Sequence, residues 1–217
     1  MTLTERVADL RNRAFAAVYD PMMKSAERGE LGRLRDEVVG SARGAVLEIG
    51  AGTGLNLPRY PVVDRLVATE PEEPMRRRLL TRAGAAPVPV EVVSAPAEAL
   101  PFDDGEFDTV VSTLVLCSVD DPSAAAREIR RVLRPGGRFL FLEHGGGEGT
   151  RAEWQRRLDG VWSAVNAGCH LTRNVTDVLA SADLHPEEMR VLEPRPVPSI
   201  ILPFRIGTAV AGGPVQS

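Results

Sequence analysis

The sequence predicts a doubly wound α/β protein whose mostly parallel sheet of seven strands ends in an antiparallel hairpin. Strand-like apolar runs alternate with helical patterns between residues 45 and 143, the order expected of a parallel sheet with helices on both faces. A glycine-rich turn follows the first of these strands. A proline-rich turn separates the last two apolar runs, which favours an antiparallel pair.

The first 40 residues predict two helices. Thr2 and Glu5 match a capping box, the usual start of a helix. Apolar residues then recur at helical spacing, and we expect this amphipathic helix to end near Asp20-Pro21. A second helix is expected over about residues 22–39.

The remaining elements follow from apolar runs and turn residues. Parallel strands are expected at residues 45–49, 65–69, 88–93, 108–116 and 138–143. Asp121-Pro122 should begin a helix that Pro135-Gly136-Gly137 ends by turning the chain into the fifth strand. A helical insertion is expected at 151–182, and the hairpin at 187–192 and 200–206.

Length and composition limit the classes of function. The 217 residues predict one domain, and the formal charge of −4 argues against a general binder of nucleic acid or anionic membrane. Two cysteines, Cys117 and Cys169, are too few for a disulfide framework or a four-cysteine zinc site. The one lysine, Lys24, argues against catalytic lysine chemistry. We expect neither a signal peptide nor a membrane anchor. We also expect a cytoplasmic monomer or homodimer that acts on a small molecule.

The glycine-rich turn reads Glu48-Ile49-Gly50-Ala51-Gly52-Thr53-Gly54. Glycines at such a turn let a ligand lie directly against the backbone. A dinucleotide site would need glycine where this chain has Leu55, which argues against a nicotinamide oxidoreductase. The pattern resembles instead the first motif of class I S-adenosylmethionine-dependent methyltransferases, which have a Rossmann-like fold.

This resemblance continues in order along the chain. Glu70 ends the second strand, Ala97-Glu98-Ala99 follows the third, Phe107-Asp108 opens the fourth, and 131–137 turns into the fifth. It implies S-adenosyl-L-methionine as cofactor, with S-adenosyl-L-homocysteine as product. It also implies that residues 1–40 form a lid over the cofactor and that residues 41–217 form the methyltransferase domain.

The resemblance also implies which residues bind the cofactor. Carboxylates at Glu48 and Glu70 would accept hydrogen bonds from its amino and ribose hydroxyl groups. Pro96 stands where many relatives carry an aspartate that meets the adenine amine, so Glu98 or backbone would have to supply that contact. The full set is Tyr19, Glu48, Gly50, Ala51, Gly52, Gly54, Asn56, Glu70, Pro71, Ala97, Glu98, Thr113 and Leu114.

A second series of residues resembles the thiol methyltransferase branch, also called the methyltransferase-like seven family. It comprises residues 113–119, Phe141-Leu142-Glu143-His144, Trp154 to Trp162, and residues 168–173. The implied reaction moves a methyl group to the sulfur of a small thiol. The alternatives are an O-, N- or C-methyltransferase acting on a quinol or natural-product intermediate, and a cofactor-binding protein without catalysis.

His144, just past the fifth strand, is the candidate general base, with Glu143 to orient it; the alternative is that His144 only hydrogen-bonds a loop. Candidate substrate-binding residues are Cys117, Trp154, Trp162 and His170. The two tryptophans, two helical turns apart, would wall an apolar pocket or simply pack.

No metal is expected in this region. Cys169 and His170 are adjacent ligands without two further partners, which makes a poor metal site. Arg173 is expected to pair with Asp177, one helical turn on.

Overall fold

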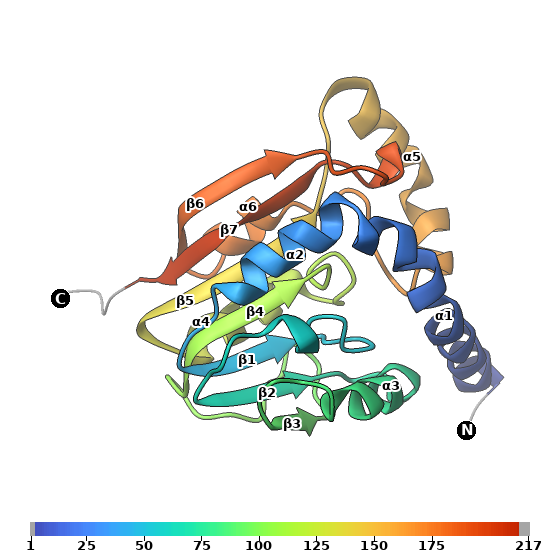
Figure 1. Ribbon diagram of the computed structural model, residues 1–217. Coiled ribbons are helices and arrows are strands. Elements are labelled where there is room, and N and C mark those ends of the chain that lie inside the picture. The colour runs from blue at the N-terminus through green and yellow to red at the C-terminus, as the bar shows by residue number, and fades with distance from the viewer. Residues whose placement is uncertain (1–2, 213–217) are drawn as a thin grey trace.

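The computed structural model describes the backbone of residues 3–212 and the side chains from residue 12 onward, so Thr2 of the expected capping box lies outside the described residues. The strands are β1 (Ala45–Ile49), β2 (Arg65–Thr69), β3 (Val90–Val93), β4 (Phe107–Thr113), β5 (Leu133–His144), β6 (Leu184–Leu192) and β7 (Phe204–Ala211). They form one seven-stranded sheet in the order β3-β2-β1-β4-β5-β7-β6 (Figure 1). β1 to β5 pair in parallel, and β7 runs antiparallel to β5 and β6. The expected fold class is confirmed.

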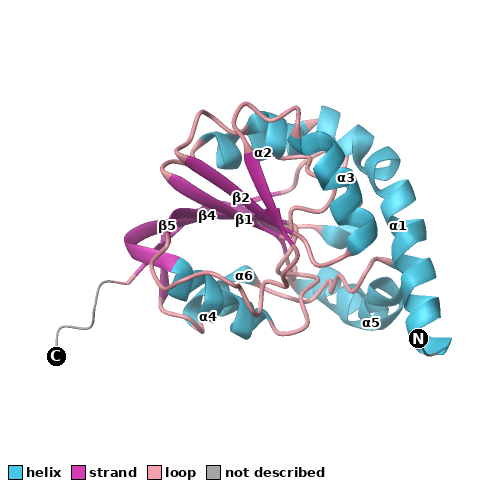
Figure 2. Ribbon diagram, turned by 90° about the horizontal axis from the view of Figure 1, so that it is seen from below, coloured by secondary structure: helices cyan, strands magenta, loops and turns pink. Residues whose placement is uncertain are grey.

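The helices form the outer layers of the sandwich. They are α1 (Leu3–Arg28), α2 (Glu30–Gly40), α3 (Glu73–Ala83), α4 (Pro122–Val132), α5 (Gly149–Val165) and α6 (Val175–Ala180). Figure 2 shows α2 and α3 on one face of the sheet and α4 and α6 on the other. α1 and α5 lie beyond the edge at which the parallel strands end (Figure 1). α5 and α6 form the expected helical insertion at 151–182, although α5 begins earlier, at Gly149.

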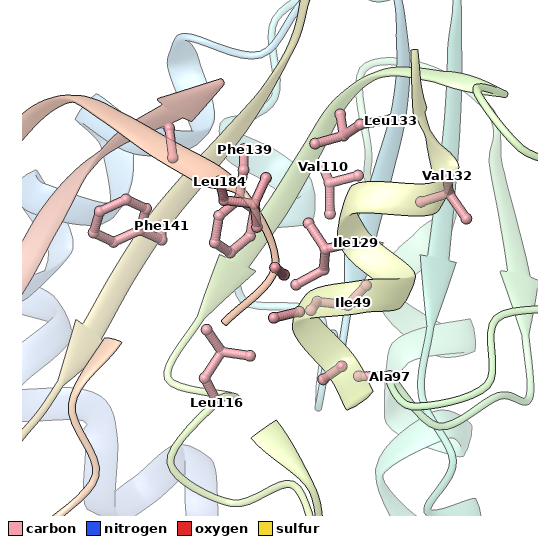
Figure 3. Packing of buried hydrophobic residues seen from close by; sticks show 14 of the residues in the cluster. Ile49, Ala97, Val110, Leu116, Ile129, Val132, Leu133, Phe139, Phe141 and Leu184 are labelled. Carbon is pink, nitrogen blue, oxygen red and sulfur yellow. The ribbon is translucent and has the colours of Figure 1, made fainter. Parts of the chain in front are cut away.

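Alternation along the strands divides the core in two. On β5, Phe139 and Phe141 pack towards α4 and α6, whereas Leu140 and Leu142 pack towards α2. Successive side chains of a strand point to opposite faces, so a strand covered on both faces is apolar at every position. Figure 3 shows the first of these clusters, in which Ile129 of α4 packs near Phe139.

The expected helix end at Asp20-Pro21 is wrong. α1 continues through Pro21 to Arg28. Proline in a helix interior removes a backbone hydrogen bond, but here the side chain of Asp20 is held by Thr53 and Arg82. The chain breaks instead at Gly29, where a Cβ would come within 2.7 Å of the carbonyl oxygen of Arg195.

Several strand boundaries also differ from the expectation. β5 begins at Leu133 rather than residue 138, because Pro135-Gly136-Gly137 forms an irregularity within the strand: its pairing with β4 jumps from Phe107↔Leu133 to Thr109↔Arg138. β7 begins at Phe204, since Ser199–Ile201 forms a short 3-10 helix before it. β4 ends at Thr113, so the residues that follow it form a turn rather than strand.

Candidate active site

The glycine-rich turn leaves room for a ligand at one position. Gly52 has φ +58°, and a Cβ built on it would meet nothing within 4 Å. At Gly50, with φ +55°, a Cβ would lie 2.6 Å from Cγ1 of Val115. Gly50 therefore permits close packing of the turn on the segment after β4, whereas Gly52 presents its backbone to open space.

Glu70 is fixed beside this open position. Its carboxylate accepts hydrogen bonds from the backbone N–H groups of Gly52 at 2.8 Å and Glu72 at 2.9 Å. The side chain is buried, and burial raises its pKa above the usual value. The predicted ribose acid thus lies at the turn, as the cofactor resemblance requires.

Glu48 lies under the turn and is bound by protein groups. Asn56 Nδ2 donates to one carboxylate oxygen at 2.8 Å, and the Tyr60 hydroxyl donates to the other at 2.9 Å. Burial raises the pKa of Glu48 to about 7. Two side chains of the protein thus already occupy the carboxylate expected to accept from the cofactor.

A buried arginine that the sequence analysis did not identify joins these groups. The Arg35 guanidinium donates to Asn56 Oδ1 at 2.8 Å, to Thr113 Oγ1 at 2.7 Å and to Glu27 Oε1 at 2.9 Å. Its side chain is 3% exposed. The available signal was its spacing from Leu31 and Val39, which places a charge within the apolar stripe of α2.

α1 is attached to the glycine-rich turn by polar contacts. Asp20 accepts a hydrogen bond from the Thr53 hydroxyl at 2.6 Å and forms a salt bridge with Arg82 of α3 at 2.7 Å. Tyr19 lies on the same helix near Arg35, and burial raises its pKa to about 12. The phenol therefore stays neutral at physiological pH.

Glu98, a predicted adenine contact, binds backbone groups of the protein. Its carboxylate accepts from the backbone N–H groups of Asp120 at 2.8 Å and Asp121 at 3.3 Å. It holds the turn before α4. Ala97 beside it is buried, and Pro96 is exposed.

Glu143 and His144 do not form the expected pair. The Glu143 carboxylate accepts hydrogen bonds from the Ser112 hydroxyl at 2.6 Å and the Val115 N–H at 3.1 Å. Adjacent strand residues point to opposite faces, so Glu143 cannot orient the imidazole directly. It instead fixes the turn after β4, where Leu114 has the unusual φ of +61°.

His144 instead contacts sulfur. Its Nε2 lies 2.9 Å from Sγ of Cys169, and the Trp162 indole N–H donates to the same sulfur at 3.4 Å. Cys117, His144 and Cys169 bring their three potential ligand atoms within 4.8 Å of one another. The neighbouring Cys117 sulfur, followed by burial, raises the pKa of Cys169.

The side chains of the other predicted acceptor residues make their contacts outside this cluster. Trp154 is 52% exposed and stacks with the Arg157 guanidinium, so it does not share the environment of Trp162. His170 Nδ1 lies 2.7 Å from Asp159 Oδ2.

The expected pairing of Arg173 with Asp177 is wrong. The Arg173 guanidinium donates to the backbone carbonyls of Leu116 and Val119. It therefore supports the turn that carries Cys117.

Among the described residues, the longest apolar stretches of helix fall short of what crossing a membrane requires.

Known proteins resemble this chain in sequence and in fold. Residues 47–141 match the family described as "Methyltransferase domain". Thiol S-methyltransferase TMT1A of Homo sapiens is 33% identical, over 90% of this chain and 82% of its own. Thiol S-methyltransferase TMT1B of Homo sapiens is 35% identical, over 89% and 80%. A SAM-dependent methyltransferase structure from Thermotoga maritima has a TM-score of 0.68 at 22% identity, covering 93% of this chain and 98% of that one. The chain is an S-adenosylmethionine-dependent methyltransferase and belongs to the thiol S-methyltransferase family.

Proposed function

We propose that this enzyme transfers a methyl group from S-adenosylmethionine to the sulfur of a small thiol. The observation that carries the proposal is the group formed by His144, Cys169, Cys117 and Trp162 at the ends of β4 and β5. Ligands of doubly wound sheets bind outside the carboxyl ends of the strands. The names of the two human relatives support a thiol as acceptor.

The described residues fit the cofactor. S-adenosylmethionine supplies an electrophilic methyl group on a sulfonium cation. Gly52 offers open space against its backbone, and the Glu70 carboxylate stands beside it to accept hydrogen bonds from ribose hydroxyls. Neutral Tyr19 on α1 offers an aromatic face of the kind that a sulfonium favours. Gly50, Ala51, Gly54, Asn56, Pro71, Ala97, Thr113 and Leu114 complete the proposed binding set.

We assign α1 the role of a lid. It reaches the glycine-rich turn through Asp20, and its last turn carries Glu27, which pairs with Arg35. Both contacts join side chains rather than backbone, so the helix can separate from the turn without breaking the sheet. A lid at this position excludes water from the reacting atoms.

The acceptor sulfur has to lose its proton and attack the methyl carbon in line. About 3% of a thiol with a pKa near 8.5 is thiolate at pH 7, so modest stabilisation of the thiolate suffices. We place this step at His144, the buried imidazole beside Cys169. Holding the sulfur in line supplies much of the acceleration.

The low cysteine content suits a reducing compartment. The chain has two cysteines in 217 residues, too few for the disulfide framework common in oxidising compartments. We therefore propose the cytoplasm as the site of action, with a monomer or homodimer as the active form and no nucleic-acid partner.

Mass spectrometry of methylated products tests the acceptor. The purified enzyme and S-adenosylmethionine would be incubated with hydrogen sulfide, alkyl thiols, phenols, amines and quinols. We expect methyl thioethers, and methanethiol from hydrogen sulfide, with loss of product in Glu70→Ala and full activity in Arg77→Met, whose exposed ion pair lies on the surface of α3. Methylation of phenols, amines or quinols alone would refute the thiol assignment.

A further inference from the structure

We propose that Cys117, His144 and Cys169 bind one Zn²⁺ ion and leave a coordination position open for the acceptor thiol. The three potential ligand atoms, two Sγ and one imidazole nitrogen, lie within 4.8 Å of one another. Cys117 and His144 are buried and Cys169 is partly exposed, so the group is enclosed but reachable. The ion-binding part stands on this geometry alone, and the role of the open position rests on the proposed function.

The donor set matches zinc in type, number and spacing. Bond lengths near 2.3 Å to sulfur and 2.0 Å to nitrogen put tetrahedral ligand atoms about 3.5–3.8 Å apart. Small side-chain rotations reach that spacing from His144 Nε2 and Cys169 Sγ, now 2.9 Å apart. Two cysteines and one histidine with a free fourth position is a known arrangement of catalytic zinc. Two thiolates also neutralise the charge of Zn²⁺, which lowers the cost of burying it.

The surrounding structure holds the ligands in place. The His170 N–H donates to the carbonyl of Cys117 at 2.8 Å, which ties the two cysteine segments together. The Trp162 indole N–H lies 3.4 Å from Cys169 Sγ, and the Ser118 hydroxyl lies 3.4 Å from Cys117 Sγ. Such donors stabilise thiolate ligands from outside the coordination shell.

The fold removes the objection that the sequence raises against a metal. In the sequence, the apparent pair is Cys169 with His170, but the His170 ring hydrogen-bonds Asp159. The missing partners are Cys117, at the turn after β4, and His144, at the end of β5. Nε2 of His144 is the nitrogen that faces the sulfurs. Nδ1 is buried and has no hydrogen-bond partner among the described residues.

With zinc bound, His144 is a ligand, so the ion rather than a free imidazole would promote loss of the thiol proton. An acceptor thiol displaces water from the open position and binds as thiolate, and its proton passes to solvent. The sulfur lone pair then forms a bond to the methyl carbon, and the electron pair of the broken carbon–sulfur bond stays on S-adenosylhomocysteine. The neutral methyl thioether is a weak ligand, and water replaces it. No oxidant or reductant is required.

Metal content and cobalt spectroscopy test the site without reference to catalysis. The full chain, purified under argon without chelator or metal-affinity resin, is analysed by mass spectrometry for metals and by thiol titration. We expect close to one zinc per chain. After removal of zinc, Co²⁺ titration should give one equivalent of thiolate-to-cobalt charge-transfer absorption. Cys117→Ala and Cys169→Ala should each weaken Co²⁺ binding strongly. The loss should exceed the about 10–100-fold caused by mutating residues that only hydrogen-bond to metal ligands.

His185→Ala is the matched control, since this exposed imidazole pairs with Asp183 away from the cluster, and it should bind one Co²⁺ as the natural chain does. Circular dichroism checks that each variant is folded. Absence of metal together with failure of the reduced natural chain to bind Co²⁺, or unchanged binding in both cysteine variants, would overturn the proposal.

A small alkyl thiol added to the cobalt protein should shift the charge-transfer band, which tests the open position. Thiol methylation by a metal-free enzyme at the full rate would overturn the catalytic role of zinc while leaving the thiol acceptor intact. A protein that binds the metal but methylates only phenols or amines would leave the metal site intact and refute the thiol acceptor.

Discussion

Arg35 offers a strict test of how the site is held together, because it joins three separate parts of the chain. Its guanidinium reaches Glu27 of α1, Asn56 beyond the glycine-rich turn and Thr113 at the end of β4. The side chain is almost fully buried, at 3% exposure. Arg35→Met preserves the length and the apolar stem but removes every one of these hydrogen bonds.

The expected loss follows from what remains buried. Removing one partner of a buried ion pair costs about 3–5 kcal/mol, because the other charge is left uncompensated. Glu27 keeps a salt bridge to Arg59 at 3.1 Å, which moderates the loss, whereas the oxygen of Asn56 loses its guanidinium donor. In a domain of this size, 1 kcal/mol shifts Tm by about 2–4 °C, so the loss corresponds to about 6–20 °C.

Thermal and urea denaturation would measure stability, and calorimetry would measure S-adenosylmethionine affinity. Arg77→Met is the matched control: Arg77 is 74% exposed in an i,i+4 pair with Glu73 and should cost less than about 0.5 kcal/mol. Arg35→Lys should recover little, since an ammonium cannot reproduce the planar donor geometry. A loss below about 1 kcal/mol for Arg35→Met would refute this account of the network.

Three further predictions concern the residues around the glycine-rich turn. Glu70→Ala should weaken S-adenosylmethionine binding by about 10–100-fold in calorimetry, since hydrogen bonds to charged groups contribute about 1.5–3 kcal/mol; unchanged affinity would contradict the ribose assignment. Because burial raises the pKa of Glu48 from 4.5 to about 7, the folded state binds more protons than the unfolded state between these values. Its contribution to stability is therefore full below about pH 4.5 and falls as pH rises through 7. Glu48→Gln should remove that decline, so its free energy of unfolding relative to the natural chain should rise by on the order of 3 kcal/mol between pH 4.5 and pH 8. Urea denaturation that shows the same pH dependence in both proteins would contradict this. Gly50→Ala should lower stability more than Gly52→Ala, because both positions have positive φ but only the first Cβ also meets Val115. Gly52→Ala should reduce cofactor affinity more; the reverse order would contradict the placement of the cofactor.

The parts of the site that local sequence determines were predictable. The glycine-rich turn and Glu70 each lie at the end of a strand with a recognisable apolar run, and parallel strands bring such ends to one edge. The sheet itself follows from the same runs. Strand boundaries shifted where a turn could be accommodated inside a strand, as at Pro135-Gly136-Gly137.

The contacts between distant side chains were not predictable from the sequence. The spacing of Arg35 on α2 indicates burial, but its partners Asn56 and Thr113 follow only from the packing of α2 on the sheet. Glu143 and His144 look like a catalytic pair because they are adjacent, but the pleat separates them. The meeting of Cys117 with Cys169 depends on the path of the segment after α5, which no periodic pattern specifies.

The arrangement of polar groups explains why the lid and the cofactor site should respond together. Polar contacts from α1 reach Thr53, Arg82, Arg35 and Arg59, and these residues also position the glycine-rich turn and its neighbours. In the lid role that we propose, a cofactor bound between the turn and α1 would stabilise the closed helix by mass action, by about 2.7 kcal/mol at a concentration 100 times Kd. Release of the product would then require the same contacts to break. Since these polar contacts are made by side chains, the lid movement that we propose for α1 would leave the pairing of the strands intact.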